Sequence, residues 1–353
     1  MKIPKIQLNQ HWHSHLSDYI TKTSWSPDGT HLAASSASGE VALYKSLTEV
    51  IILRSADENA INSLSFSANG QFLAVGGQSG EVIVWDIHTP NCPIVLHRSH
   101  PGKWIDQLAW HPEHNHLAYG SSSQVQVWDI ATNTQITELE FQNSSVLHLT
   151  WHPAGKCLTA SGHGGMKIWF ADDWQRDFKL IEVPGASLWA TWSGDGRYLA
   201  SGNLDRTLTV AEWDSPPPWL MQGFPGKVNQ LDWSTQSGAP LLAASCVEAI
   251  TVWQRGDKSE SGWQSQVLKH HRDRVNAIAF QPDSRLLASA SQDGQVALWH
   301  NGKRLAQVLQ NFTAGASCLA WHPNGQQLAA GGSAGEIQVW QIANRAKGFG
   351  SAR

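Results

Sequence analysis

The sequence predicts an all-β protein in which one unit of four short antiparallel strands repeats around a closed ring. Two observations support this prediction. Apolar and polar residues alternate with a period of two in each short segment, and no long segment has the 3.6-residue period of a helix. An aromatic residue also recurs every 41 to 47 residues, directly before a turn. These aromatic positions are Trp25, Phe66, Trp110, Trp151, Trp192, Trp233, Phe280 and Trp321.

The recurring aromatic ends the first strand of each unit. A short alternating run precedes it, as in residues 61–66 and 275–280, and a turn sequence follows it, as in residues 26–29 (Ser-Pro-Asp-Gly). Proline and Asp-Gly or Asn-Gly pairs favour the tight backbone that reverses a strand. The pattern therefore predicts that the first strand turns directly into a second one.

Three further strands are expected in each unit. The second is rich in small residues, as in 72–77 and 327–332, and small side chains let sheets approach closely. A more polar fourth strand, such as 135–141, completes most units. The third strand ends in an aromatic in seven units, at Tyr44, Trp85, Trp128, Trp169, Trp253, Trp299 and Trp340. In unit five, Ala211 stands at this position, and Trp213 follows two residues later.

Four short strands in each repeat of about 40–45 residues are typical of a β-propeller blade. The runs Val-Trp-Asp at 84–86 and 127–129 resemble the signature of the WD-repeat family, and the resemblance covers residues 1–342. The count of units favours eight blades in a single closed propeller, with seven, the commoner number in that family, as the alternative. Residues 343–353 are expected to form a C-terminal tail.

The last unit lacks an outer strand of its own. Only residues 341–353 follow Trp340, and they do not alternate as a strand should. Residues 5–10 do alternate and precede the first inner strand. We therefore expect the N-terminal segment to pair with the last blade and close the ring, which removes exposed sheet edges.

Composition and charge exclude several classes of protein. Only 15% of residues are charged and 41% are apolar, with 19 Trp and 30 Gly, which argues for a packed core rather than disorder. The net charge of −4 gives no basic face for a nucleic-acid partner. No apolar run is long enough for a membrane span, and a secretory signal is not expected in residues 1–12.

The cysteines and the absence of catalytic motifs give further expectations. The four cysteines are far apart in the sequence, which suggests reduced, buried thiols in a cytoplasmic protein. No nucleotide-binding loop, nucleophile elbow or paired-carboxylate motif is present. We therefore expect no catalytic activity and no cofactor.

The WD-repeat resemblance also implies a buried hydrogen-bonded set in unit seven, formed by His271, Ser289, Asp293 and Trp299. The first three residue types also occur in catalytic triads. The family places these residues inside a blade, however, so a structural role is expected.

Seventeen histidines are the chemical peculiarity of this sequence. His11, His13 and His15 alternate, so an extended strand places all three on one face, where neutral imidazoles could hold Zn²⁺, Ni²⁺ or Cu²⁺. In the alternative interpretation, His15 is the structural histidine of the first blade. His111 and His152 occupy equivalent Trp-His-Pro turns of adjacent units, where histidine either joins a metal site or replaces the serine of other turns.

The resemblance further implies that partners bind the top face of the ring, at positions six and four residues before each inner-strand aromatic. Trp104, Tyr19 and Arg274 are residue types that dominate interface energies; packing over its own strand is the alternative for Trp104. The leading hypothesis is a non-catalytic scaffold that docks proteins or peptides. A metal-linked binding protein is the alternative, and a ligand site in the central channel is a third. The candidate docking residues are Tyr19, Thr21, Asn62, Trp104, Asp106, Leu147, Leu188, Lys227, Asn229, Arg274 and Asn276.

Overall fold

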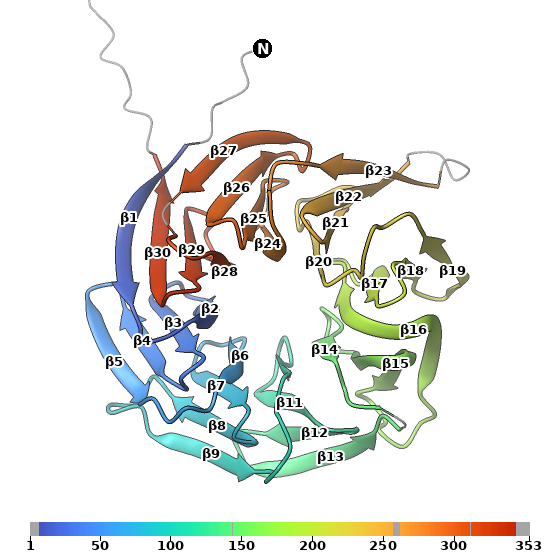
Figure 1. The fold of residues 1–353 in the computed structure, drawn as a ribbon. Helices are drawn as coiled ribbons and strands as arrows, with labels where there is room; N and C mark the ends of the chain where they lie inside the picture. The colour runs from blue at the N-terminus through green and yellow to red at the C-terminus, as the bar shows by residue number, and fades with distance from the viewer. Residues whose placement is uncertain (1–6, 143, 257–261, 311, 344–353) are drawn as a thin grey trace, which may run out of the picture.

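In the part of the chain that the structure describes, thirty strands form a ring around a central axis, as Figure 1 shows for the computed structural model. The structure describes residues 7–142, 144–256, 262–310 and 312–343. No helix occurs within these residues, and so none is present there that could cross a membrane. Every pairing between neighbouring strands is antiparallel, and the strands are ordered in seven sheets. The prediction of an all-β propeller is thus confirmed.

Units one to three each form a separate four-stranded sheet. The first comprises β2 (Ile20–Trp25), β3 (His31–Ser36), β4 (Val41–Lys45) and β5 (Glu49–Arg54). The second comprises β6 (Ile61–Phe66), β7 (Phe72–Gly77), β8 (Glu81–Asp86) and β9 (Ile94–Ser99). The third comprises β10 (Leu108–Trp110), β11 (His116–Ser121), β12 (Gln124–Asp129) and β13 (Thr134–Glu140).

Units four and five share one six-stranded sheet. Its strands are β14 (His148–Trp151), β15 (Cys157–Phe170), β16 (Lys179–Trp192), β17 (Tyr198–Asn203), β18 (Leu208–Glu212) and β19 (Ser215–Met221). Unit six has β20 (Gln230–Trp233), β21 (Leu241–Cys246), β22 (Ala249–Arg255) and β23 (Trp263–Leu268). Unit seven has β24 (Val275–Phe280), β25 (Leu287–Ser291), β26 (Gln295–His300) and β27 (Arg304–Gln310).

The favoured count of eight blades is corrected to seven when blades are counted as hydrogen-bonded sheets. The reason lies in the 14-residue strands β15 and β16, which continue through positions where the other units break. His163 pairs with Ala186, so the ladder persists through the connection between units four and five. The eight sequence units each still supply an inner strand, two of them to this one sheet.

The N-terminal segment closes the ring, as predicted. The last sheet contains β28 (Ala316–Trp321), β29 (Gln327–Gly332), β30 (Glu336–Ile342) and, outermost, β1 (Leu8–His15). The pairing runs from Leu8 opposite Ile342 to His15 opposite Glu336. The closing strand is therefore residues 8–15 rather than the predicted 5–10, and residues 5 and 6 lie outside the described residues, as does the predicted tail beyond Ala343.

Apolar contacts between neighbouring sheets make up the core. One cluster joins Leu43 of the first sheet to Leu73 of the second, and both side chains are fully buried. Four of the recurring inner-strand tryptophans add a polar link, because their indole N–H groups donate to a backbone carbonyl of the preceding unit. The bonds run from Trp110 to Ser65, Trp151 to Ala109, Trp233 to Thr191 and Trp321 to Ala279, at 3.0–3.2 Å. Tryptophan at this position thus supplies both packing area and an inter-sheet hydrogen bond.

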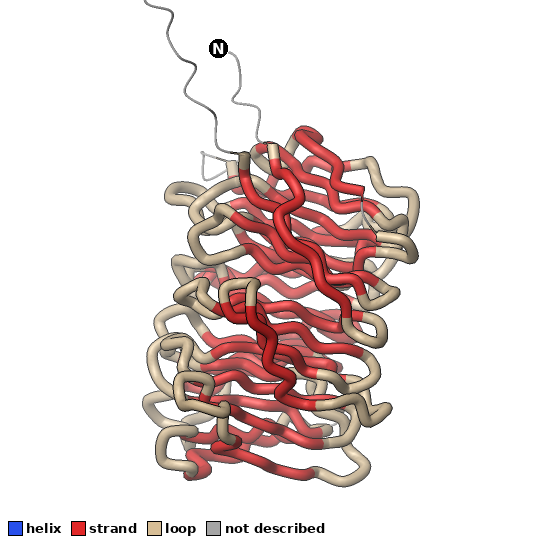
Figure 2. Tube along the Cα trace, turned by 90° about the vertical axis from the view of Figure 1, so that its left-hand side faces the viewer, coloured by secondary structure: helices blue, strands red, loops and turns tan. Residues whose placement is uncertain are grey.

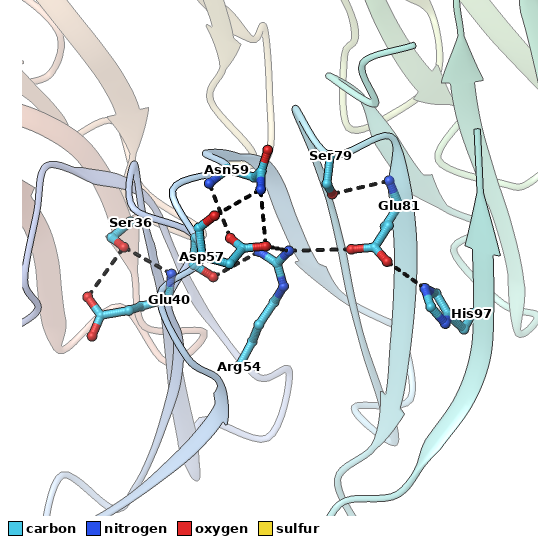
Figure 3. Close-up of polar contacts among 9 residues, drawn as sticks. Ser36, Glu40, Arg54, Asp57, Asn59, Ser79, Glu81 and His97 are labelled. Carbon is cyan, nitrogen blue, oxygen red and sulfur yellow. Dashed lines mark hydrogen bonds and ion pairs between the residues drawn. The ribbon is translucent and has the colours of Figure 1, made fainter. Parts of the chain in front are cut away.

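A polar network links the first two sheets near their outer edges (Figure 3). The Arg54 guanidinium, with 12% of its side chain exposed, donates to Asp57 at 2.6 Å and to Glu81 at 3.4 Å. It also donates to the Gly39 carbonyl at 3.0 Å. His97 contacts the second oxygen of Glu81 at 2.9 Å. Arg54 therefore holds a loop of the first sheet and a strand of the second in one arrangement.

The strands are flanked by loops on two opposite faces of the ring (Figure 2). The top face is the face whose loops lead from the outer strand of one unit to the inner strand of the next. The bottom face carries the turns between first and second strands and between third and fourth strands.

Candidate functional site

The predicted docking residues lie on the top face, in the loops that enter the inner strands or at the first residues of those strands. Tyr19 and Thr21 lie at the start of β2, and Asn62 lies in β6. Leu188 lies within β16, where its inner-strand portion begins. The structure distributes the set around the mouth of the ring and does not gather it into one pocket. The set therefore falls into separate sectors of the ring.

Trp104 is the most accessible aromatic of this set. Its side chain is 58% exposed, in the loop between β9 and β10. A hollow of about 360 Å³ lies beside it, and Lys103, Asp106 and Ser145 contribute to its walls. The indole is therefore not packed into the core. It stands beside a hollow whose lining also includes one lysine, one aspartate and two serines.

Asp106 is held in place by the preceding unit. The Asn62 side-chain amide donates to the Asp106 carboxylate at 2.5 Å, across the boundary between the second and third sheets. Both residues are partly buried. This bond fixes the carboxylate in the wall of the Trp104 hollow, so two of the predicted residues act together.

Arg274 and Asn276 of unit seven and Tyr19 of unit one form a second sector, on either side of unit eight. The Arg274 side chain is exposed, and its Nε donates to the Asn276 side chain at 3.2 Å. Asn276 in turn donates to the Ala316 carbonyl of the next unit at 2.9 Å. Burial raises the pKa of the Tyr19 hydroxyl, so this phenol remains neutral. The sector presents one guanidinium supported by an amide and flanked by a phenol.

The remaining predicted residues are more scattered. Lys227 is exposed, whereas Asn229 and Leu188 are partly buried. Leu147 is 36% exposed, so the expected apolar patch with Leu188 is small. Thr21 shares a hydrogen bond of 2.8 Å with Ser35 of its own sheet.

The four residues expected to form a buried set in unit seven are brought together by the structure. His271 contacts Asp293 through Nδ1 at 3.1 Å and the Ser289 hydroxyl through Nε2 at 2.8 Å. The Trp299 indole donates to the same hydroxyl at 2.9 Å. The Asp293 carboxylate also accepts from the Arg272 backbone N–H at 2.9 Å. Because the Ser289 side chain is fully buried, the set ties strands and loop together and offers no surface for a substrate.

His11, His13 and His15 lie on β1, and all three are exposed. The register of β1 against β30 shifts between Gln10 and Trp12, so His11 sits at an irregularity of the strand. Over the residues that the structure describes, no group of three or more His, Cys, Asp or Glu side chains is placed to hold a metal ion. The predicted metal site at these histidines thus has no geometric support in the structure.

The Trp-His-Pro histidines have a different role from metal binding. His111 accepts the backbone N–H groups of Glu113 and His114 on Nδ1, at 3.1 and 3.0 Å. Its Nε2 lies 3.2 Å from the Gly155 carbonyl of the next unit and donates to it. His152 repeats the arrangement toward Gly196. Both ring nitrogens of His111 are therefore occupied, and the histidine replaces the serine of other turns while adding an inter-unit bond.

Two glycines are required by these histidines. A Cβ at Gly155 or Gly196 would lie 2.3 Å from the imidazole of His111 or His152 respectively. Both glycines also have positive φ, 67° and 70°. The paired signal, histidine in one turn and glycine in the next, was present in the sequence but became interpretable only with the inter-unit contact.

Sequence reasoning missed the surface formed by units four and five on the bottom face. Trp174 and Trp213 are both partly exposed there and line one cleft of about 920 Å³. The irregular position of Trp213, two residues after Ala211, was the available signal. No repeat spacing or motif places Trp174 in the same cleft.

The four cysteines are free and buried in the structure. Burial raises the pKa of the Cys157 thiol to about 12 and also raises the pKa of the other three thiols. The thiols are thus protonated at neutral pH and are not placed for nucleophilic chemistry.

Two family models match parts of the chain. A model described as "WD domain, G-beta repeat" matches residues 6–45, 262–300 and 303–341. A model described as "Nucleolar protein 10-like, N-terminal domain" matches residues 45–173. The matched segments cover observed sheets from both ends of the chain, in agreement with the ring geometry.

The chain is also similar to several curated proteins. It is 25% identical over 249 residues to the Arabidopsis thaliana protein "Cell division cycle 20.1, cofactor of APC complex", covering 66% of this chain and 54% of that protein. It is 27% identical over 220 residues to "THO complex subunit 3" of Arabidopsis thaliana, covering 60% and 67%. It is 22% identical over 273 residues to the human "Serine-threonine kinase receptor-associated protein", covering 77% and 64%. The chain thus spans about half to two thirds of the length of these relatives.

Proposed function

Because this chain is a WD-repeat β-propeller protein, we propose that it is a non-catalytic scaffold that docks a protein or peptide partner on its top face. The observation that carries the proposal is the exposed Trp104 indole beside its hollow. A large rigid aromatic with little conformational freedom is the kind of side chain that anchors protein interfaces. The Asn62–Asp106 bond already orders one wall of this hollow, which lowers the entropy cost of binding.

The relatives are consistent with this proposal. One is named as the cofactor of a complex, another as a complex subunit and a third as receptor-associated. None of these names describes a reaction. The buried His271 set and the protonated thiols add no catalytic group to the top face.

Site-specific photocrosslinking tests the proposal. A benzophenone amino acid is placed at Trp104, and in a matched control at Leu305, which is 45% exposed on the outer strand β27. Both proteins are exposed to host extract. A partner crosslinked at position 104 and absent at position 305 supports docking on the top face. Equal capture at both positions contradicts it.

The captured partner then gives a quantitative prediction. Trp104→Ala is expected to weaken its binding by about thirtyfold, the effect of losing an anchor worth about 2 kcal/mol. Arg274→Ala, in the second sector, is expected to weaken binding only if the partner spans the ring. Thermal midpoints equal to that of the wild type are required of both variants. Unchanged affinity of Trp104→Ala at an unchanged midpoint would falsify the assignment of Trp104.

A further inference from the structure

A second candidate binding site lies on the bottom face, on the opposite side of the ring from Trp104. It is the cleft of about 920 Å³ lined by Phe170, Trp174 and Trp213 and by the turns 111–116, 152–157 and 195–197. We call it the bottom-face cleft. Its volume is more than twice that of the Trp104 hollow. Such a volume is sufficient for a side chain and part of a peptide backbone.

The walls of the bottom-face cleft are aromatic and firmly supported. Trp174 packs edge-on against Trp151 with ring centroids 6.0 Å apart, and Trp213 packs edge-on against Trp192 at 5.3 Å. Trp192 is itself fixed by a hydrogen bond of 3.1 Å to the buried Thr159 hydroxyl. Trp174 and Trp213 remain partly exposed. Part of each indole is therefore accessible from the cleft.

The rim of the cleft carries three carboxylates and two cations. Glu113, Asp172 and Asp195 line it and are exposed. None of the three carboxylates lies within ion-pair distance of a cation among the residues that the structure describes. The Arg197 guanidinium lies 2.7 Å from Glu212, a carboxylate that Arg255 also contacts at 3.0 Å, so Lys156 and Arg197 are the opposing charges in the lining. Carboxylates thus outnumber the cations available to them.

The same aromatic rings already bind cations of this chain on an adjoining hollow. The Arg176 guanidinium lies 4.0 Å from the centre of the Phe170 ring, and the Lys179 ammonium lies 4.5 Å from the centre of the Trp213 ring. Lys179 is also 3.8 Å from Asp214. A cation over an indole with a carboxylate nearby is thus an arrangement that this surface already contains.

We propose that the bottom-face cleft binds a basic peptide segment of a partner, with an arginine or lysine head group against Trp174 and Trp213. The indole faces supply cation–π attraction, and Asp172 and Asp195 supply opposite charge at the rim. The site is independent of the top-face docking proposed above, since none of its lining residues belongs to the Trp104 hollow. The ring would then engage partners on both faces.

Peptide binding to the full-length protein tests this proposal. The probe is a fluorescein-labelled peptide of alternating arginine and glycine, measured by fluorescence anisotropy. One matched peptide carries citrulline, a neutral isostere, at each arginine, and another carries glutamate. The arginine peptide is expected to bind at least about tenfold more tightly than the citrulline peptide. Equal binding of these two peptides, tighter binding of the glutamate peptide, or no binding of the arginine peptide overturns the proposal.

Variants locate the peptide on the molecule. Asp172→Asn and Trp174→Leu are expected to weaken the arginine peptide by about threefold to tenfold each. Asp172 is exposed and accepts no hydrogen bond from a described residue, so its variant is not expected to unfold. Glu58→Gln removes an exposed carboxylate and Leu204→Ala an exposed apolar side chain on the top face, and both are expected to leave binding unchanged. Equal losses in the top-face pair would show non-specific attraction and overturn the assignment of the cleft.

Discussion

At the scale of single residues, His111 shows how one side chain can satisfy a turn and a neighbouring unit together. Its Nδ1 accepts two backbone N–H groups and its Nε2 donates to Gly155. His111→Ala leaves these groups without partners in a buried place and is expected to lower the free energy of unfolding by about 1–3 kcal/mol. Urea denaturation measures this loss.

His114→Ala is the control for that prediction. The His114 ring stacks on His111 with centroids 4.6 Å apart but is exposed to solvent. Its removal is expected to change the free energy of unfolding by no more than about 0.5 kcal/mol. Comparable losses in the two variants would show that stacking, rather than the bonds from His111, stabilises the turn.

At the scale of strands and sheets, Arg54 joins one blade to the next. Arg54→Met retains much of the apolar stem but leaves Asp57 and Glu81 without their shared cation. The expected loss in the free energy of unfolding is about 1–3 kcal/mol, because these are charge-assisted bonds of a mostly buried guanidinium. Arg304→Met, at an exposed position of β27, is the control and is expected to stay within about 0.5 kcal/mol.

A double-mutant cycle with Glu81→Gln separates the bond from other effects of removing Arg54. If Arg54 acts through Glu81, the sum of the losses in unfolding free energy of the two single variants is expected to exceed the loss of the double variant by about 0.5 kcal/mol or more. Strictly additive losses, measured by urea denaturation, would assign the effect of Arg54 to Asp57 and the Gly39 carbonyl instead.

The strands were predictable from the sequence because each unit repeats the same local requirements. The alternation before Phe66 or Phe280 and the turn residues after Trp25 act within a few residues, so they are visible in the chain itself. The fusion of units four and five was not predictable. It depends on the pairing of His163 with Ala186, which neither local pattern specifies. The same holds for the register of β1, which is set by β30 from the far end of the chain.

The candidate sites also divide into those that the sequence predicts and those that it does not. The position of Trp104 follows from the repeat spacing, whereas its exposure depends on the path of the loop between β9 and β10. Trp174 and Trp213 lie in irregular stretches, so no repeat spacing predicts that they line one cleft. Sequence reasoning thus finds sites that obey the repeat and misses those that arise where it is broken.

At the scale of the whole molecule, buried histidines make stability depend on pH. Burial lowers the pKa of several imidazoles, so the folded state binds fewer protons than the unfolded state. Each such group stabilises the fold fully above pH 6.5, its ordinary pKa, and loses this contribution as the pH falls below that value. The histidines with lowered pKa are His31, His100, His111, His116, His148, His152 and His271.

One partly buried carboxyl acts in the opposite direction. Burial raises the pKa of Asp232 to about 7, although its carboxylate accepts the Phe280 backbone N–H of the next unit at 2.6 Å. A raised carboxyl pKa stabilises the fold fully below pH 3.8 and loses this contribution as the pH rises through about 7. The Asp232→Asn variant keeps an acceptor for Phe280 but cannot titrate. It is therefore expected to lose more stability than the wild type when the pH falls from 7.5 to 5.

His148 gives the sharpest test of this balance. Burial lowers its pKa to about 3, its ring centroid lies 4.0 Å from that of Trp189 with the two rings tilted by 33°, and its Nδ1 has no hydrogen-bond partner. Between pH 7.5 and 5 the unfolded state gains a proton that folded His148 does not, which costs about 2 kcal/mol of unfolding free energy. His148→Leu removes this group, so its loss over that interval is expected to be about 2 kcal/mol smaller than that of the wild type. Urea denaturation at both pH values measures the difference. A wild-type pH profile in His148→Leu and in Asp232→Asn would mean that neither buried group governs the response to acid.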